Sequence, residues 1–152
     1  MSADDHVTTR RAAIDDLDAI VPLFDGYRRF YEQPADLEGA RRFIGARLQA
    51  GDSAIFVAER DRHPIGFTQL YPSFSSAWMK RVWVLNDLFV GSAHRGRGFG
   101  KALIIAAEAF ARGGGAKGLV LATQKTNSIA KALYEAQGWQ IDGAFDHYHR
   151  FF

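Results

Sequence analysis

The order of apolar and polar residues predicts two helices near the start of the chain. Apolar side chains recur at helical spacing through residues 15–31 and again through residues 35–50, which indicates two amphipathic helices. A short strand at residues 7–11 precedes them. Pro34 is expected to end the first helix and Gly51 the second, because neither residue continues a helix well.

Strand patterns follow the second helix. Two short runs of mainly apolar residues, 55–59 and 65–71, are joined by a turn-like polar segment, so they are predicted to form a hairpin. Residues 72–79 are expected to be a polar loop. A longer apolar strand is predicted at residues 82–90.

The last third of the chain opens with a glycine-rich turn between a strand and a helix. The elements predicted after this turn are a helix to about residue 112, a buried strand at 119–123, a helix at 128–137 and two more strands in the tail, 139–152. The strand, helix and strand between residues 82 and 123 form a crossover, so the expected fold class is a mixed α/β (α+β) sheet. We expect a single domain over residues 1–152.

Composition favours one globular domain and argues against several other classes. With 152 residues, of which 47% are hydrophobic and 24% charged, the chain is long enough to bury a core. Its net charge of +2 is too nearly balanced for a general nucleic-acid-binding protein, so no stable nucleic-acid binding is expected. The charge is uneven, since residues 1–75 carry nine basic and twelve acidic side chains, whereas residues 76–152 carry ten and five. The second half therefore favours an anion and the first half a cation.

The absence of cysteine from the sequence excludes disulfides, a thiol nucleophile and a zinc site with cysteine ligands. The first six residues lack the basic start and apolar stretch of a secretion signal. No apolar run approaches the length of a membrane span, about 18 residues. We therefore expect a cytoplasmic protein that has no membrane segment.

The glycine-rich turn has the composition of an anion site. Glycines at positions 96, 98 and 100 let backbone N–H groups converge at a helix N-terminus, and Arg95, Arg97 and Lys101 add positive charge. The turn lacks the spacing of a P-loop and the third glycine of a dinucleotide fingerprint, and the next strand has no acid to hold a ribose. A nucleotide-binding domain is thus disfavoured, and the pyrophosphate of another cofactor fits. A glycine triplet could also turn the chain without binding anything.

Two motifs together resemble those of the GNAT family of acetyl-coenzyme-A-dependent N-acetyltransferases. The first is Arg95-Gly96-Arg97-Gly98-Phe99-Gly100, which matches the family signature of Arg or Gln, two residues, Gly, one residue, and Gly or Ala. The second motif contains residue types that the family also has, in the same order: Asn127, Ala130, Leu133, Tyr134, Gly138 and Trp139. The stretches 69–76 and 85–90 look most like the branch that acetylates histone tails, polyamines and small amines or amino acids.

This resemblance implies a fold, a reaction and a set of binding residues. The GNAT fold has a central, mixed but mostly antiparallel sheet of about six to seven strands, flanked by about four helices. The implied cosubstrate is acetyl-coenzyme A, and the implied acceptor is a small-molecule amine or a basic peptide that attacks directly in a ternary complex. The positions that would bind the coenzyme are Leu88, Phe89, Val90, Arg95, Gly96, Arg97, Gly98, Phe99, Gly100, Lys101 and Asn127.

Two residues are candidates for the chemistry. The resemblance makes Tyr134 the proton donor to the departing thiolate, although its helical spacing with Ala130 is also that of a core aromatic residue. Asp87 is the only ionisable residue of the apolar run 82–90. It could hold a cationic amine, accept its proton through water, or make only a structural hydrogen bond. Asn127 could equally cap the last helix.

The remaining expectations concern the acceptor pocket, metals and assembly. The candidate pocket residues are Tyr27, Tyr31, Glu32 and Tyr71. His147 and His149 alternate along the tail without a nearby set of acids or cysteines, so no metal site is predicted. The aromatic tail could dock on the same chain or complete a partner's sheet, and we expect the second, a homodimer. The alternative function is a non-catalytic module on the same fold that binds or senses acyl-coenzyme A.

Overall fold

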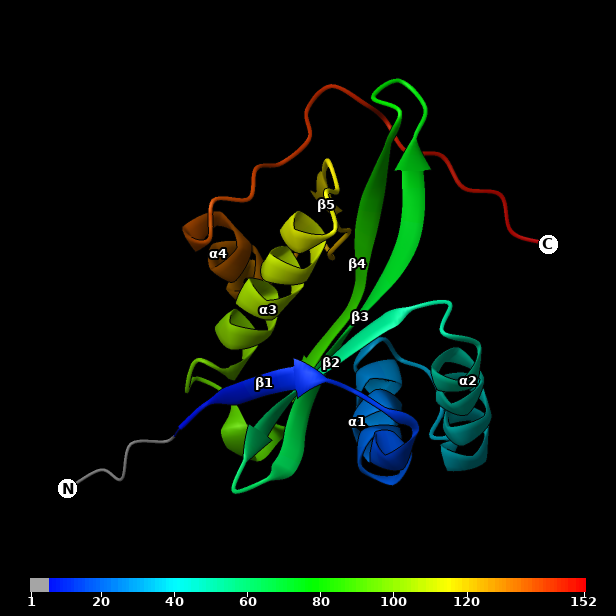
Figure 1. Ribbon diagram of the computed structural model, residues 1–152, viewed down its shortest axis with the longest axis vertical. Helices are drawn as coiled ribbons and strands as arrows, with labels where there is room; N and C mark the ends of the chain where they lie inside the picture. The colour runs from blue at the N-terminus through cyan, green and yellow to red at the C-terminus, as the bar shows by residue number, and fades with distance from the viewer. Residues whose placement is uncertain (1–5) are drawn as a thin grey trace. The chain divides into compact units, whose positions relative to one another are not determined.

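The computed structural model describes residues 6–152 and contains a five-stranded sheet and four α-helices (Figure 1). The expectation about a secretion signal rests largely on residues 1–5, which lie outside the described residues. The chain divides into a first unit that ends at Ala122 and a second unit over Thr123–Phe152. Within residues 6–152, no helix is both long and apolar enough to cross a membrane.

The sheet belongs to the first unit and has the strand order β1-β2-β3-β4-β5. The strands are β1 (Thr8–Arg11), β2 (Ala54–Arg60), β3 (His63–Ser75), β4 (Lys80–Val90) and β5 (Gly118–Val120). The first four pair antiparallel with their neighbours, and β5 pairs parallel with β4. The predicted mixed sheet, the β2–β3 hairpin and the crossover from β4 to β5 are therefore confirmed.

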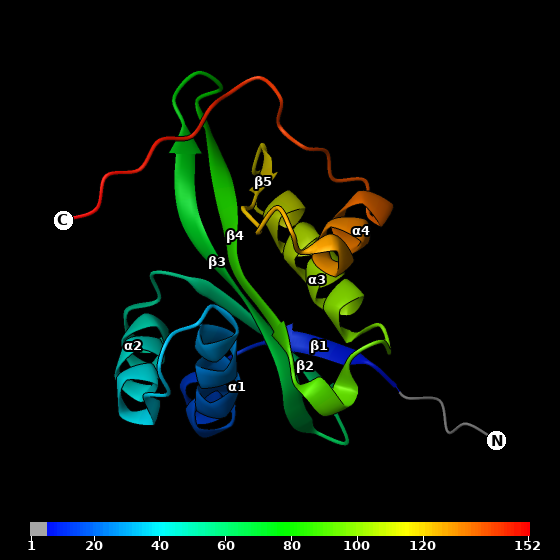
Figure 2. The same ribbon diagram turned by 180° about the vertical axis from the view of Figure 1, so that it is seen from behind.

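Helices cover both faces of this sheet (Figures 1 and 2). One face carries α1 (Leu17–Phe30) and α2 (Leu37–Ala50), and the other carries α3 (Phe99–Gly113). The first helix ends at the predicted place, where Glu32 adopts a left-handed backbone with φ of 62°. The second helix begins after Asp36, whose side chain accepts a hydrogen bond from the Gly39 N–H.

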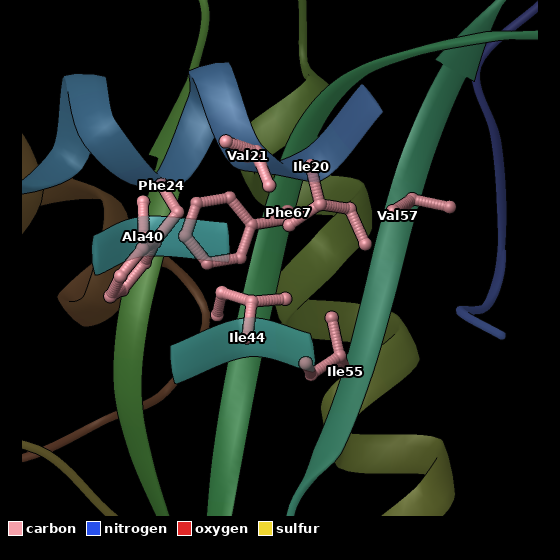
Figure 3. Close-up of a cluster of buried hydrophobic side chains, with 8 residues drawn as sticks. All are labelled: Ile20, Val21, Phe24, Ala40, Ile44, Ile55, Val57 and Phe67. Atoms are coloured by element: carbon pink, nitrogen blue, oxygen red, sulfur yellow. The ribbon is translucent and has the colours of Figure 1, made fainter. Parts of the chain in front are cut away.

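The main core lies between β2, β3 and the α1–α2 pair (Figure 3). Its buried members are Ile20, Val21, Phe24, Ala40, Ile44, Ile55, Val57 and Phe67. The opposite face of β2 is also covered, because the ring of Phe56 lies 5.3 Å from that of Phe110 on α3. Burial on both faces explains why β2 is a continuous apolar run rather than an alternating one.

The prediction of a polar loop at residues 72–79 is wrong for residues 72–75, which belong to a strand. β3 continues to Ser75, which pairs with Lys80 of β4, so the turn is confined to residues 76–79. β2 pairs with β3 only as far as Leu70, so Pro72 faces no partner on that side that would need its missing N–H.

The second unit contains α4 (Ser128–Ala136) and a tail that differs from the prediction. Residues 139–152 contain no strand, so the two predicted tail strands are wrong, and the sheet has five strands instead of about six to seven. The alternation of Phe145, His147, His149 and Phe151 fits a strand pattern. Alternation alone does not supply the partner strand that a β-ladder requires.

Candidate active site

β4 carries a β-bulge at Asn86. Gln69 of β3 pairs with Asp87, whereas Leu70 pairs with Leu85, which leaves Asn86 without a register partner on β3. In a regular strand, residues 85 and 87 would point to the same face of the sheet. Because of the bulge, Leu85 shares a face with Leu70, while Asp87 shares the opposite, α1-covered face with Gln69. The bulge therefore turns the carboxylate toward α1.

Asp87 is buried, and both of its carboxylate oxygens accept hydrogen bonds. Its exposed fraction is 2%. Gln69 Nε2 donates to Asp87 Oδ2 at 2.7 Å, and Asn86 Nδ2 donates to Asp87 Oδ1 at 2.7 Å. Burial raises the pKa of Asp87 above its ordinary value, and the hydrogen bonds from Asn86 and Gln69 offset part of that rise. No ion pair formed by the described residues includes this carboxylate.

Three of the four predicted pocket residues gather around Asp87. Tyr27 and Tyr31 of α1 have ring centroids 5.0 Å apart, and the Tyr27 hydroxyl donates to the Asn86 carbonyl oxygen at 3.0 Å. Burial and the nearby Asp87 charge raise the pKa of Tyr71 to about 12, and they raise the pKa values of Tyr27 and Tyr31 in the same way. Neutral phenol rings beside one buried carboxylate make a site that suits a cation.

Glu32, the fourth predicted pocket residue, lies on the surface at the end of α1. Its N–H donates to the Arg29 carbonyl oxygen, and its left-handed backbone ends the helix. These observations give Glu32 a role in helix termination.

The edge of β4 that faces away from β3 lies next to Asp87 and these tyrosines. Gly91 N–H donates to the Ile65 carbonyl oxygen, so the hydrogen-bonded pairs with β3 fall at residues 91, 89 and 87. The N–H groups of Leu88 and Val90 consequently point away from β3. On that side β5 pairs only with residues 82–84, so β4 and β5 separate before Leu88 is reached.

The glycine-rich turn connects this edge to α3. Gly96 and Gly98 have φ angles of 75° and 87°, and a Cβ at either position would meet nothing within 4 Å, so the turn is open and depends on glycine. No side chain caps the N-terminus of α3, and the first helical hydrogen bond runs from Ala102 N to Gly98 O. The N–H groups of Phe99, Gly100 and Lys101 at this N-terminus precede that bond and suit an anion.

The side chain of Arg95 is part of the turn's framework. Its Nε donates to the Val90 carbonyl oxygen at 3.0 Å, and its guanidinium lies 5.2 Å from the centre of the Phe89 ring. Arg95 thus ties the turn to the end of β4. The side chains of Arg97 and Lys101 are exposed.

The remaining predicted site residues, Asn127 and Tyr134, belong to the second unit. The Asn127 side chain accepts a hydrogen bond of 3.2 Å from the Ala130 N–H, so it caps α4. The ring of Tyr134 lies 5.8 Å from that of Trp139, and the Trp139 N–H donates to the Tyr134 carbonyl oxygen.

Sequence reasoning did not single out Ser53 and Gln69 as site residues. Ser53 Oγ donates to Gln69 Oε1 at 2.9 Å, and Gln69 in turn reaches Asp87. The available signal was the amide side chain of Gln69 within the mainly apolar run 65–71, next to a strand that contains one acid. Among residues 6–152, no group of three or more His, Asp or Glu side chains is arranged to hold a metal ion.

Comparison with protein families gives one match that spans most of the chain. Residues 20–139 match the model of the acetyltransferase (GNAT) family. The chain is 49% identical over 139 residues to the uncharacterized N-acetyltransferase YhfO of Bacillus subtilis, which covers 91% of this chain and 93% of that protein. A probable acetyltransferase of Haemophilus influenzae is 35% identical over 75 residues, or 49% of this chain and 51% of that protein.

Solved structures share the fold. The crystal structure of a probable acetyltransferase matches with a TM-score of 0.90 and 35% identity, covering 95% of this chain and 97% of the other. An aminoglycoside acetyltransferase from an uncultured soil metagenomic sample, solved in complex with trehalose, matches with a TM-score of 0.83 over 98% of both chains. At 19% identity, the second match concerns the fold alone.

Proposed function

The chain belongs to the acetyltransferase (GNAT) family and is an N-acetyltransferase, and we propose that it transfers acetyl from acetyl-coenzyme A to a cationic primary amine. The mixed five-stranded sheet with four helices is the GNAT fold that the sequence motifs implied. The proposed acceptor is an aliphatic amine, such as a polyamine, an amino acid or a lysine side chain. It attacks directly, in a ternary complex.

The observation that carries the proposal is the junction of two differently charged sites on β4. The N–H groups of Leu88 and Val90 lie on its free edge, and the chain runs from there into the open glycine turn and the uncapped start of α3. The buried carboxylate of Asp87 immediately precedes Leu88 and faces the tyrosines. In the proposal, β4 therefore brings the amide donors that lead into the anion-binding turn next to a carboxylate that binds the cationic amine.

The residues present fit a coenzyme-A pyrophosphate. Gly96 and Gly98 leave open space where side chains would stand, and the backbone from Gly96 through Lys101 offers N–H donors at the start of α3. In the proposal, the strand amides of Leu88 and Val90 hold the pantetheine arm and polarise the acetyl carbonyl, whereas the N–H of Phe89, also predicted as a coenzyme contact, points toward β3. Bound acetyl-coenzyme A supplies the activated thioester.

The acceptor end is proposed to work through Asp87 and the tyrosines. Asp87 holds the ammonium form of the acceptor and then accepts one of its protons through water, which leaves the neutral amine to attack the thioester carbonyl. The rings of Tyr27, Tyr31 and Tyr71 line this site. The family resemblance assigns the proton for the departing thiolate to Tyr134. Asn127, which caps α4, is also proposed to contact the coenzyme.

A thiol-release assay tests the function. Acetyl-coenzyme A is incubated with the protein and a panel of polyamines, amino acids, aminoglycosides and basic peptides, and free thiol is followed over time. Release with an aliphatic amine supports the proposal. Calorimetric binding of acetyl-coenzyme A without thiol release for any amine supports the non-catalytic module instead, and binding of ATP or NAD in preference would overturn both.

We also propose that the chain forms a homodimer through its aromatic tail. The side chains of Phe145, Tyr148, Phe151 and Phe152 are all largely exposed. Exposed aromatic residues close together in a segment are typical of protein interfaces. A monomeric mass by light scattering across working concentrations would overturn this proposal.

A further inference from the structure

Three buried polar side chains form one hydrogen-bonded chain across the sheet. Ser53, just before β2, donates to Gln69 Oε1 at 2.9 Å, and Gln69 Nε2 donates to Asp87 Oδ2 at 2.7 Å. Their exposed fractions are 7%, 0% and 2%. Since a buried polar group that loses its partner has no water to replace it, each link depends on the next.

The hydrogen bonds that link Ser53, Gln69 and Asp87 can run in only one direction. An ionised carboxylate only accepts hydrogen bonds, so the Gln69 amide must present its Nε2 to Asp87. The amide oxygen then faces away and needs a donor, which the Ser53 hydroxyl provides. Ser53 therefore selects the orientation of the Gln69 amide that supports Asp87.

The groups facing Asp87 do not neutralise its charge. Those on α1 are the phenols of Tyr27 and Tyr31, and the one on β3 is the phenol of Tyr71. An ion pair between Arg47 and Asp52, which contact each other at 2.7 Å, acts on Tyr71. A buried carboxylate with donors but no cationic partner costs stability, which is typical of a group retained for function.

We propose that Ser53 and Gln69 are positioning residues that hold the Asp87 carboxylate in the orientation and charge state that receives the acceptor ammonium. This inference rests on the proposed function, because it assigns Asp87 to the acceptor. It adds a specific dependence: the affinity for the amine is set by two side chains that do not touch it. The coenzyme site lies on the free edge of β4 and is independent of them.

The test compares the titration of Asp87 in the wild type, Gln69→Leu and Ser53→Ala. Protein labelled with ¹³C at the aspartate carboxyl is titrated by NMR, and the Asp87 signal is assigned by its loss in Asp87→Asn. Removing the Gln69 donor is expected to raise the Asp87 pKa by about one pH unit. Ser53→Ala is expected to produce a smaller shift in the same direction, and Ser53→Thr, which keeps the hydroxyl, should restore the wild-type midpoint.

Steady-state kinetics provide the second readout. For an amine that the protein acetylates, the acidic limb of the kcat/KM profile should move to higher pH in Gln69→Leu by the same interval. At pH values below the wild-type midpoint, the KM for the acceptor should rise about tenfold, whereas the KM for acetyl-coenzyme A stays unchanged. A merely structural role would lower stability and leave both the midpoint and this split unmoved.

Thr68→Val is the matched control. Thr68 is as buried as Gln69 and lies next to it, but its hydroxyl donates to the backbone carbonyl of Asp87 at 2.7 Å, not to the carboxylate. This variant should lose stability without shifting the Asp87 titration. Equal Asp87 midpoints in the wild type, Gln69→Leu and Ser53→Ala would overturn the proposal. If Gln69→Leu does not fold, Ser53→Ala decides, and the NMR titration gives its answer even if no amine is acetylated.

Discussion

The hydroxyl of Tyr27 donates a hydrogen bond of 3.0 Å to the carbonyl oxygen of Asn86, the residue bulged out of β4. A bulge leaves one backbone carbonyl and N–H outside the regular ladder. Here α1 satisfies the carbonyl, so the helix that carries Tyr27 and Tyr31 of the proposed acceptor pocket also stabilises the irregularity that turns Asp87 toward them.

Tyr27→Phe should weaken this junction. The variant keeps the ring that contacts Phe67 but leaves the Asn86 carbonyl without its donor, so the free energy of unfolding should fall by about 1 kcal/mol. Urea unfolding measures this loss, and the acceptor KM should rise with it. Tyr31→Phe is the control, since the contacts described for Tyr31 are made by its ring and backbone. An equal loss in both variants would contradict the role assigned to the hydroxyl.

The stability of the protein should depend on pH through Asp87, with a definite sign. Its folded-state pKa is raised by burial, so over the interval above the ordinary aspartate value of about 4 the native state binds more protons than the unfolded state. Wild-type stability should therefore fall as pH rises through that interval, relative to Asp87→Asn, which cannot ionise. Thermal unfolding of both proteins at a series of pH values measures the difference.

The same substitution should remove acceptor turnover. Asp87→Asn would then be more stable than the wild type at neutral pH and less active, as expected where a buried charge is kept for function. A wild type that gains stability over Asp87→Asn as pH rises would show that the hydrogen bonds from Gln69 and Asn86 outweigh burial.

Gly98→Ala should weaken binding at the proposed anion site, and a control variant can separate this effect from the loss of stability. The φ of 87° at Gly98 is in the left-handed region, where a Cβ costs about 1 kcal/mol. Its added methyl group would also stand in the open turn, so acetyl-coenzyme A affinity measured by calorimetry should fall at least tenfold. Gly115→Ala has a matching φ of 73° and equally open surroundings at the other end of α3. It should cost similar stability and leave coenzyme affinity intact.

Most of the first unit follows from patterns that can be read in the sequence. The spacing of apolar residues and the positions of turn residues predicted the helices, the β2–β3 hairpin and the crossover, because each of these depends on local spacing and on one apolar face. The glycine turn was equally accessible, since a positive φ at Gly96 and Gly98 requires that residue type. The clustering of Tyr27, Tyr31 and Tyr71 followed only from the family resemblance.

The bulge at Asn86 could not be predicted, and much of the site depends on it. Regular alternation places Asp87 on the same face as Leu85, which is a core residue, so the strand pattern alone gives the wrong face for the carboxylate. The Ser53–Gln69 link was hidden for a related reason. It joins residues sixteen apart whose contact depends on strand register, which sequence spacing does not specify.

The contact between α1 and β4 predicts a contrast between two helix glycines. A Cβ at Gly26 would lie 2.9 Å from Cζ of Phe89, so Gly26→Ala should push that ring away and lower the unfolding free energy by about 1–3 kcal/mol. The Phe89 ring also packs against the Arg95 guanidinium, so a shift of the ring should weaken coenzyme affinity.

Gly45 of α2 provides the contrast, because the nearest atom to a Cβ there is Leu17 Cδ2 at 3.5 Å, an ordinary contact. Gly45→Ala should instead stabilise the protein by about 0.5–1 kcal/mol. Equal effects of the two variants in urea unfolding would contradict the tight packing of Gly26 on Phe89.

Replacing Tyr134 by Phe tests proton donation separately from binding. The phenol oxygen is lost while the ring and its contact with Trp139 can remain. General acid catalysis contributes about 10²–10⁴-fold to a rate, and kcat should fall by about 100-fold while the Kd for acetyl-coenzyme A changes little. Tyr148→Phe, which alters an exposed tail tyrosine, should leave kcat unchanged.

Unchanged turnover in Tyr134→Phe would assign proton transfer to another group. A parallel loss of turnover and coenzyme affinity would make the hydroxyl a binding contact, because a proton donor acts on the departing thiolate and not on the bound ground state.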